Sequence, residues 1–229
     1  MRTIFTHSLS IAAVAALTLL PGNVAAQDDS GILNSLEVRQ LVGRAEPGDH
    51  VRLSAHFSAL GNRYAAEAKR HRSMAQSFIG NPSRNLGTGM SAHCKRLADL
   101  NTQAATTVRE LAAYHEKLAS GTRATPPKDG ARFQGGAGAP EPTEKESKAL
   151  AAKASTPAQH RALEEYFLTL AKRYTSDANE HVTLAQTYCG TRIAQAAVHH
   201  DRLASLSRDA AKEATAAAEM HKGLAGVAR

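Results

Sequence analysis

The chain has 229 residues, enough for one or two modest domains, and it combines a formal net charge of +7 with 4% aromatic residues, no Trp and 11 His. The positive charge is spread along the chain, without the aromatic stacking platforms or the reading motif that nucleic-acid binding uses, so we expect no nucleic-acid partner. The abundance of histidine is the anomaly that a function has to explain.

The first 26 residues have the features of a secretory signal peptide. Arg2 gives a short positive start, the apolar run LSIAAVAALTLL follows, and the small residues VAA precede Gln27. The apolar run is too short for a membrane anchor, and no later segment could span a bilayer. We therefore expect cleavage near Ala26 and a periplasmic or secreted protein of a Gram-negative bacterium. Residues 27–45 form an N-terminal segment, with a short leading helix over 33–44.

The remainder of the chain contains an internal repeat. The segment PGDHVRLSAHFSALGNRYAAEAKRHRSMAQSFIG at 47–80 aligns without gaps with PAQHRALEEYFLTLAKRYTSDANEHVTLAQTYCG at 157–190, and HCKRLADL at 93–100 aligns with HHDRLASL at 199–206. A repeat of this length is typical of two copies of one structural unit.

Each copy predicts a pair of helices joined by a turn. Pro47 and Pro157 suit a first helical turn, with Thr156 as an N-cap, and a glycine at position 80 or 190 closes the first helix. A turn over 80–89 and a shorter one after Gly190 lead to second helices at about 91–120 and 194–224, which are rich in the strong helix former alanine.

The two copies are separated by residues 121–156, which hold four of the eight prolines and read as a linker with a short helix near 143–153. Neither helix pair alone buries enough apolar surface. We therefore predict an all-α fold, a four-helix bundle built from two duplicated antiparallel helical hairpins at residues 46–120 and 157–226.

Heptad spacing predicts which side chains face the core of this bundle. With His50 at position a, an uninterrupted seam of a and d positions runs through the first helix of each copy. The seam residues are His50, Leu53, Phe57, Leu60, Tyr64, Glu67, His71, Met74 and Phe78 in one copy and His160, Leu163, Phe167, Leu170, Tyr174, Asp177, His181, Leu184 and Tyr188 in the other. The second helices place His93 and His115, and His199 and His221, on a similar stripe.

Antiparallel pairing then sets histidine opposite histidine. If both hairpin turns lie at the same end, two layers about 30 Å apart are predicted, since 21 residues rise about 1.5 Å each. The turn-end layer is His71, His93, His181 and His199, with Glu67 and Asp177 one helical turn away. The open-end layer is His50, His115, His160 and His221. If the hairpins associate head to tail, both layers dissolve into mixed pairs, and the sequence leaves this orientation open.

Buried neutral imidazoles point to a transition metal. Neutral imidazole suits zinc, copper, nickel and iron, and a buried carboxylate needs a partner that a metal could supply. The predicted function is therefore metal binding, with copper or zinc favoured, for storage, buffering or delivery by a histidine-rich exported protein. The predicted ligands are the histidines of both layers together with Glu67 and Asp177.

Three alternatives remain open at this point. The histidines could hydrogen-bond to one another in a metal-free helical protein that interacts with an envelope protein partner. They could bind haem, although the absence of C-x-x-C-H excludes covalent attachment. They could also form a carboxylate-bridged di-metal redox centre. No motif of hydrolytic catalysis is present, so no catalytic residue is predicted and an enzyme is not the favoured class.

Four further residues are interpreted individually. His56 and His200 do not repeat, so we expect them to be ordinary surface or flanking histidines. Cys94 could be an additional soft ligand near the turn-end layer. Export to an oxidising compartment favours a disulfide between Cys94 and Cys189. In regular helices, however, the predicted distance between the two cysteines along the bundle axis is longer than a disulfide can bridge.

Overall fold

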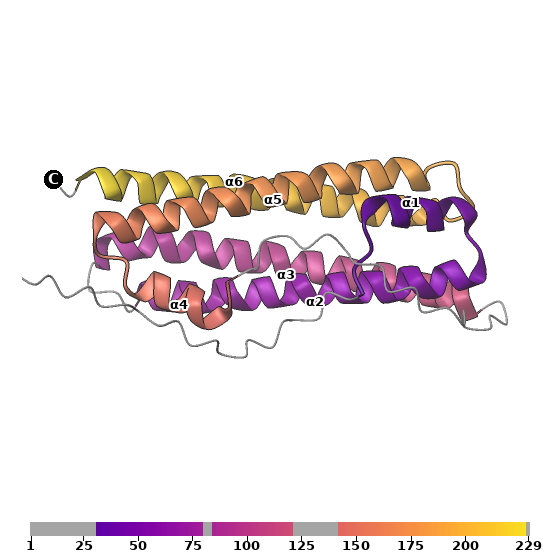
Figure 1. The fold of residues 1–229 in the computed structure, drawn as a ribbon, viewed down its shortest axis with the longest axis horizontal. Coiled ribbons are helices and arrows are strands. Elements are labelled where there is room, and N and C mark those ends of the chain that lie inside the picture. Colours follow the sequence, from indigo (N-terminus) through magenta and orange to yellow (C-terminus); the bar gives the residue numbers. More distant parts are fainter. Residues whose placement is uncertain (1–30, 80–83, 121–141, 228–229) are drawn as a thin grey trace, which may run out of the picture.

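A computed structural model describes residues 31–79, 84–120 and 142–227. The predicted signal segment lies outside these residues, as does most of the predicted linker. The described chain is all α-helical, with two short helices and four long ones, and the long helices form a helical bundle (Figure 1).

The short helices are fixed by local capping. α1 (Ser35–Arg44) begins after Asn34, whose side chain accepts a hydrogen bond from the backbone N–H of Glu37 while the Glu37 side chain returns one to Asn34. α4 (Glu144–Ala152) begins with the same reciprocal arrangement between Thr143 and Glu146. Such capping boxes satisfy two backbone donors that a short helix could not satisfy itself. Both helices lie where the sequence predicts them.

The long helices are α2 (Pro47–Ile79), α3 (Arg84–Ser120), α5 (Pro157–Tyr188) and α6 (Gln195–Val227). Thr156 caps α5 through a capping box with Gln159, and Pro157 occupies the first turn, as predicted. The turn predicted at 80–89 is too long, because α3 already begins at Arg84. Helix propensity, including the cost of about 1 kcal/mol per glycine, is a weak signal that tertiary packing routinely overrides.

The long helices pack as two antiparallel pairs, α2 with α3 and α5 with α6, and α3 also packs against α6. The hairpins are oriented head to tail. In Figure 1 the end of α2 lies at the left, beside the start of α5, whereas the end of α5 lies at the right, beside the start of α2. α1 and α4 sit at opposite ends of the bundle, and each contacts both α2 and α5 (Figure 1).

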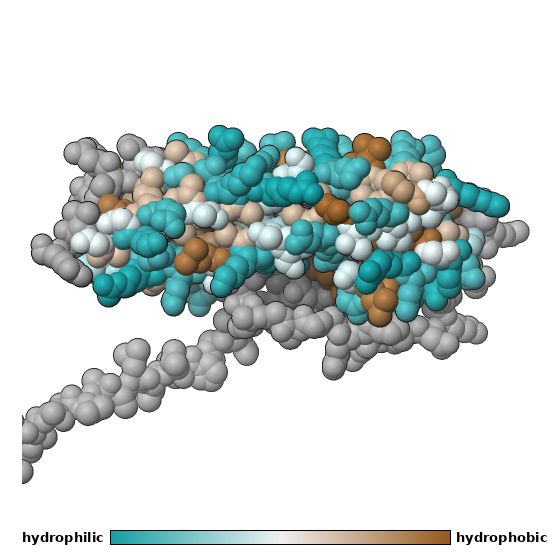
Figure 2. Space-filling view, turned by 90° about the horizontal axis from the view of Figure 1, so that it is seen from above, coloured by the Kyte–Doolittle hydropathy of each residue, from teal (hydrophilic) through white to brown (hydrophobic). Residues whose placement is uncertain are grey.

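The predicted seam forms the core. Every residue of the α2 seam is buried, and so is every residue of the α5 seam except the half-buried Asp177. The view in Figure 2 shows a mostly hydrophilic surface, and the large apolar side chains that are exposed are scattered along the chain. None of the helices in the described part of the chain combines the length and the apolar character needed to cross a bilayer.

Candidate functional site

Three histidine pairs are buried between the helices of the two hairpins, and all three have nearly the same geometry. The Nδ1 atoms are 3.1 Å apart in His50–His115, 3.1 Å apart in His160–His221 and 3.2 Å apart in His181–His200. The ring centroids of the three pairs are separated by 5.2, 5.4 and 5.4 Å, respectively. In each pair the two Nδ1 atoms therefore face each other directly.

The four-histidine layers predicted for turns at the same end do not form. Head-to-tail packing instead places the His50–His115 pair of one hairpin at the same end of the bundle as the His181–His200 pair of the other. Phe57 lies between them, with its ring centroid 5.5 Å from that of His115 and 5.6 Å from that of His200. We call these residues, with His56 and Tyr188, the α1-end cluster.

The opposite end of the bundle holds a related but different set of side chains. His160–His221 occupies the place of His50–His115, and the Phe167 ring stacks on His221 at a centroid distance of 5.6 Å and an interplanar angle of 8°. The His71 ring also stacks on Phe167, at a centroid distance of 6.5 Å. We call these residues, with Phe78 and Cys94, the α4-end cluster.

Two of the predicted inward-facing histidines lie at the edge of the core. His93 Nδ1 is 2.5 Å from a carboxylate oxygen of Glu213, and His199 Nδ1 is 3.8 Å from one of Glu110, both across the α3–α6 interface. The next residue on each helix, Cys94 or His200, is the one that is fully buried. The predicted stripe was therefore wrong by one residue at this point.

His56 and His200 are buried, which corrects their interpretation as surface or flanking residues. His56 is 4% exposed and its Nδ1 accepts a hydrogen bond of 2.9 Å from the backbone N–H of Leu33, which ties the segment before α1 to α2. His200 is fully buried opposite His181. The sequence already contained a signal for His200. In an antiparallel helix pair, residues at the same level have residue numbers with a constant sum. His181 and His200 have the same sum as His160 and His221, whereas the sum for His181 and His199 is one lower.

Tyrosines extend two of the pairs into longer hydrogen-bonded chains. Tyr188 Oη is 3.0 Å from His115 Nε2, and Tyr64 Oη is 3.3 Å from His181 Nε2. The third pair has no such extension, because Phe78 stands at the position equivalent to Tyr188, and His221 Nε2 is buried without a hydrogen-bond partner.

Burial keeps the paired imidazoles neutral. Loss of hydration lowers the pKa of His115 and His181 to about 3 and that of His221 to about 4, and it lowers the pKa of His200 well below the usual range. Nearby charges, including those of other histidines, act in the same direction. The described pairs therefore present neutral rings near neutral pH, which is the form that binds a metal ion.

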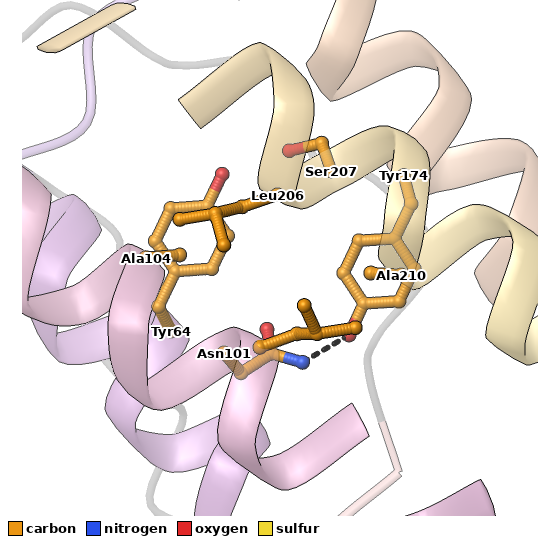
Figure 3. Close-up of a pocket in the computed structure, with 8 residues that line it drawn as sticks. Tyr64, Asn101, Ala104, Tyr174, Leu206, Ser207 and Ala210 are labelled. Atoms are coloured by element: carbon orange, nitrogen blue, oxygen red, sulfur yellow. Dashed lines mark hydrogen bonds between the residues drawn. The ribbon is translucent and has the colours of Figure 1, made fainter. Parts of the chain in front are cut away.

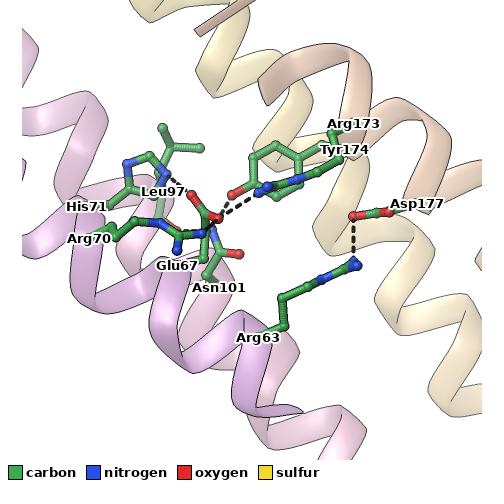
Figure 4. A network of polar contacts seen from close by, with 9 residues as sticks. All are labelled: Arg63, Glu67, Arg70, His71, Leu97, Asn101, Arg173, Tyr174 and Asp177. Carbon is green, nitrogen blue, oxygen red and sulfur yellow. Dashed lines mark hydrogen bonds and ion pairs between the residues drawn. The ribbon is translucent and has the colours of Figure 1, made fainter. Parts of the chain in front are cut away.

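Glu67 is the centre of a charged network rather than a ligand facing the pairs (Figure 4). Its Oε1 is 3.1 Å from His71 Nε2, and its Oε2 accepts hydrogen bonds from Arg70 and, at 2.7 Å, from Arg173 of the other hairpin. Burial alone would raise the pKa of Glu67, but the contacts with His71 and the charges of both arginines outweigh it and hold that pKa well below its usual range.

Asp177 has a separate partner. Its Oδ2 is 3.5 Å from a guanidinium nitrogen of Arg63, and this ion pair crosses from α5 to α2 next to the Glu67 network (Figure 4). The two predicted acidic ligands therefore contact arginines of the opposite hairpin.

The middle of the bundle separates the two clusters. Tyr64 and Tyr174 project into it from α2 and α5, and Asn101 donates a hydrogen bond of 2.6 Å to Tyr174 Oη (Figure 3). The small side chains of Ala104 and Ala210 leave a narrow gap there that does not admit a water molecule. This gap offers no room for a ligand.

The two cysteines are free. Cys94 is buried in the α4-end cluster, whereas Cys189 is exposed after the end of α5, at the other end of the bundle. The predicted difficulty of joining them is thus confirmed, and head-to-tail packing is the reason.

Within the described residues, no three His, Cys, Asp or Glu side chains converge closely enough to hold one metal ion. Comparison with known proteins gives no further guidance, because no family model, no curated protein and no solved structure matches the chain. The histidine pairs are therefore the feature on which a function has to be argued.

Proposed function

We propose that this protein binds transition metal ions, copper or zinc, through its buried histidine pairs, and that it stores, buffers or delivers them. The observation that carries the proposal is the recurrence of one geometry at three places. Apolar packing alone does not turn the same nitrogen of both rings inward three times. A hydrogen bond between the rings does so, and a pair of ligands for one ion needs the same arrangement.

The separation of the paired nitrogens fits this role. Imidazole nitrogen lies about 2.0 Å from a bound zinc ion, and two such ligands at a tetrahedral angle are about 3.3 Å apart. The observed distances of 3.1 to 3.2 Å need only a small adjustment of the rings. Tyr188 and Tyr64 would then accept hydrogen bonds from the outer nitrogens of His115 and His181, an arrangement that orients metal-bound imidazoles in other proteins.

Two nitrogens per site favour copper over zinc. Zinc in structural sites takes four protein ligands, whereas Cu(I) is a soft ion that is stable with two ligands and accepts imidazole. Two-coordinate Cu(I) is near-linear and sets its two nitrogens about 3.8 Å apart, so the paired rings would have to separate by about 0.6 Å to hold it. Each pair offers two nitrogens and is packed against aromatic rings that exclude further ligands. Cu(I) is therefore the ion that we expect each pair to prefer.

The wider organisation belongs to the same proposal. We infer a periplasmic or secreted four-helix bundle that arose by duplication of one hairpin, with residues 46–120 and 157–226 as the two copies and residues 121–156 as the linker. Equivalent capped short helices and equivalent pairs His50–His115 and His160–His221 in the two halves support this inference.

The test is the metal stoichiometry of the mature protein, purified without a His tag and titrated anaerobically with Cu(I) and separately with Zn(II). His50→Ala and His160→Ala each remove the partly accessible member of one pair and should each abolish binding of one Cu(I). His93→Ala is the matched control, because His93 lies outside the pairs, and it should leave the stoichiometry unchanged. Absence of binding by the folded wild-type protein would refute the proposal.

The pH dependence of binding provides a second check. A site made of histidines with the ordinary pKa of about 6.5 would lose metal affinity below that pH. Because burial lowers the pKa of the paired histidines, protons should compete for the nitrogens only at lower pH. We therefore expect Cu(I) affinity to stay nearly constant from pH 8 to pH 6 and to decline only as the pH falls further.

A metal-free helical protein of the envelope that acts through a protein partner is the second candidate. The observation that favours it is the chain from Tyr188 through His115 to His50, which satisfies buried polar atoms without any ion. Failure to bind metal, together with full stability in the presence of a chelator, would support it. Haem is less well supported, because paired rings in direct contact leave no space for a macrocycle between them.

A further inference from the structure

The helical register defines a fourth pair that is not made of two histidines. In the α5–α6 hairpin, His181 lies 21 residues after His160, and its partner His200 lies 21 residues before His221. A step of 21 residues forward on the first helix and 21 residues back on the second thus leads from one observed pair to the other. In the α2–α3 hairpin the same step from His50 and His115 leads to His71 and Cys94.

His71 is oriented to use this position. The ring is fully buried, and its Nε2 lies 3.1 Å from Glu67 Oε1, which occupies the outer nitrogen. Both ring nitrogens are buried without a partner in hydrogen-bond geometry, and the carboxylate beside Nε2 leaves Nδ1 as the nitrogen available to a ligand. Nδ1 is also the atom that faces the partner residue in each of the three histidine pairs.

Glu67 fixes the chemical state of that nitrogen. The carboxylate is itself held by Arg70 and Arg173, and its charge 3.1 Å from Nε2 favours the tautomer of His71 with the proton on Nε2, which leaves the Nδ1 lone pair free of a proton. A carboxylate behind a histidine is the common way in which proteins orient and strengthen a metal-binding imidazole. The other pairs use a tyrosine, or nothing, in this place.

The register of the α2–α3 hairpin places Cys94, whose side chain offers sulfur instead of nitrogen, at the level of His71. The side chain of Cys94 is fully buried, and its thiol lies close enough to Glu213 for the carboxylate charge to affect the pKa of the thiol. Burial, and to a smaller extent Glu213, raises the pKa of the thiol well above its usual range. An unbound Cys94 therefore keeps its proton and is not a reactive nucleophile.

We propose that His71 and Cys94 form a fourth metal site, a mixed nitrogen–sulfur site for a thiophilic ion such as Cu(I). The proposal rests on the proposed metal-binding function and adds that the two ends of the bundle differ in ligand chemistry. Binding replaces the S–H bond of Cys94 by a Cu–S bond and releases the proton to water, while His71 donates its Nδ1 lone pair. The copper remains Cu(I), so no oxidant or reductant is required.

The proton distinguishes this site from the other three. A neutral imidazole pair binds a metal ion without net proton release, whereas a protonated thiol must lose one proton for each ion bound. The affinity of the fourth site should therefore increase about tenfold per pH unit between pH 6 and pH 8, over a range where the histidine pairs change little.

The experiment is anaerobic titration with Cu(I), followed by proton release and by the sulfur contribution to the copper X-ray absorption. Cys189→Ser removes the exposed thiol and is the matched control. It should still bind four Cu(I) ions, three at the observed pairs and one at the fourth site, with release of one proton. Cys94→Ser should bind three ions, release no proton and lose the short copper–sulfur distance. His71→Ala should behave like Cys94→Ser.

The outcomes distinguish failure of the fourth site from failure of the proposed metal-binding function. Binding of no copper at all would refute the metal-binding function. Binding to the Cys189→Ser protein without proton release would overturn the fourth site while leaving the histidine pairs intact. The second result needs only a variant of an exposed residue, so it does not depend on whether Cys94→Ser folds.

Discussion

The unpartnered Nε2 of His221 predicts a stabilising substitution. Phe78 lies beside His221 with a centroid distance of 5.8 Å, and Tyr188 lies beside His115 with a centroid distance of 5.9 Å. In the second case the tyrosine hydroxyl is 3.0 Å from His115 Nε2. A hydroxyl added by Phe78→Tyr should therefore lie within hydrogen-bond distance of His221 Nε2.

The magnitude follows from what the new hydroxyl satisfies. An intramolecular hydrogen bond contributes about 1 kcal/mol net, and here it also gives a partner to a buried nitrogen that lacks one. The free energy of unfolding should rise by about 1 kcal/mol, which corresponds to an increase of about 3 °C in Tm for a chain of this size. The reverse change, Tyr188→Phe, leaves His115 Nε2 unpartnered and should cost about 2 kcal/mol.

The assay is urea unfolding of both variants and of the double variant, with a chelator present so that no metal contributes. Because positions 78 and 188 lie at opposite ends of the bundle, the two effects should add. A Phe78→Tyr protein that is destabilised by 1 kcal/mol or more would refute the reasoning, because it would mean that the hydroxyl is buried without reaching His221.

Three further predictions concern charge. Burial lowers the pKa of His115 and His181 to about 3 and that of His221 to about 4, so these histidines take up protons near pH 6.5 in the unfolded chain but not in the folded protein. Their contribution to stability is therefore complete above pH 6.5 and is lost as the pH falls towards 4, by about 1.4 kcal/mol per pH unit for each of the three, as urea unfolding at several pH values will show. Glu67→Gln leaves two arginines without their buried anion and should cost about 3 kcal/mol in the same assay. Asp177→Asn breaks a half-exposed pair and should cost less than 1 kcal/mol, so equal costs for the two substitutions would contradict the distinction between them.

The sequence predicted the helices and their buried faces because both follow from local periodicity. A seam of a and d positions over about eight turns has one interpretation, and the N-cap at Thr156 is completed by Gln159, three residues further along the chain. The identity of the buried residue at 93–94 and 199–200 was harder to predict. Neighbouring residues on a helix differ by about 100° in direction, and His199-His200 offers a histidine either way, so the count of histidines could not decide which one faces His181.

Heptad spacing also could not predict the different contacts of the two acidic residues in the seams. Glu67 and Asp177 occupy equivalent seam positions, which predicted equivalent roles as ligands. The structure instead surrounds Glu67 with His71 and two arginines, whereas Asp177 contacts Arg63 across the hairpins. The difference arises from Arg70, whose equivalent in the second hairpin is Glu180, an acidic residue. Repeated positions thus predict equivalent places in the fold but not equivalent chemistry.

The head-to-tail orientation, which heptad spacing left open, agrees with the charges across the α2–α5 interface. If both turns lay at the same end and α2 and α5 were neighbours, these helices would run parallel, and Glu67 would share a level with Asp177 and Arg63 with Arg173. Reversing one hairpin sets acid against base: Glu67 contacts Arg173 and Arg63 contacts Asp177. Like charges at close range destabilise, and a buried carboxylate without a partner is costly, so the reversed arrangement is preferred. The same reversal brings the His50–His115 pair of one hairpin beside the His181–His200 pair of the other, so the arrangement that pairs Glu67 and Asp177 with arginines is also the one that gathers these histidines at one end of the bundle.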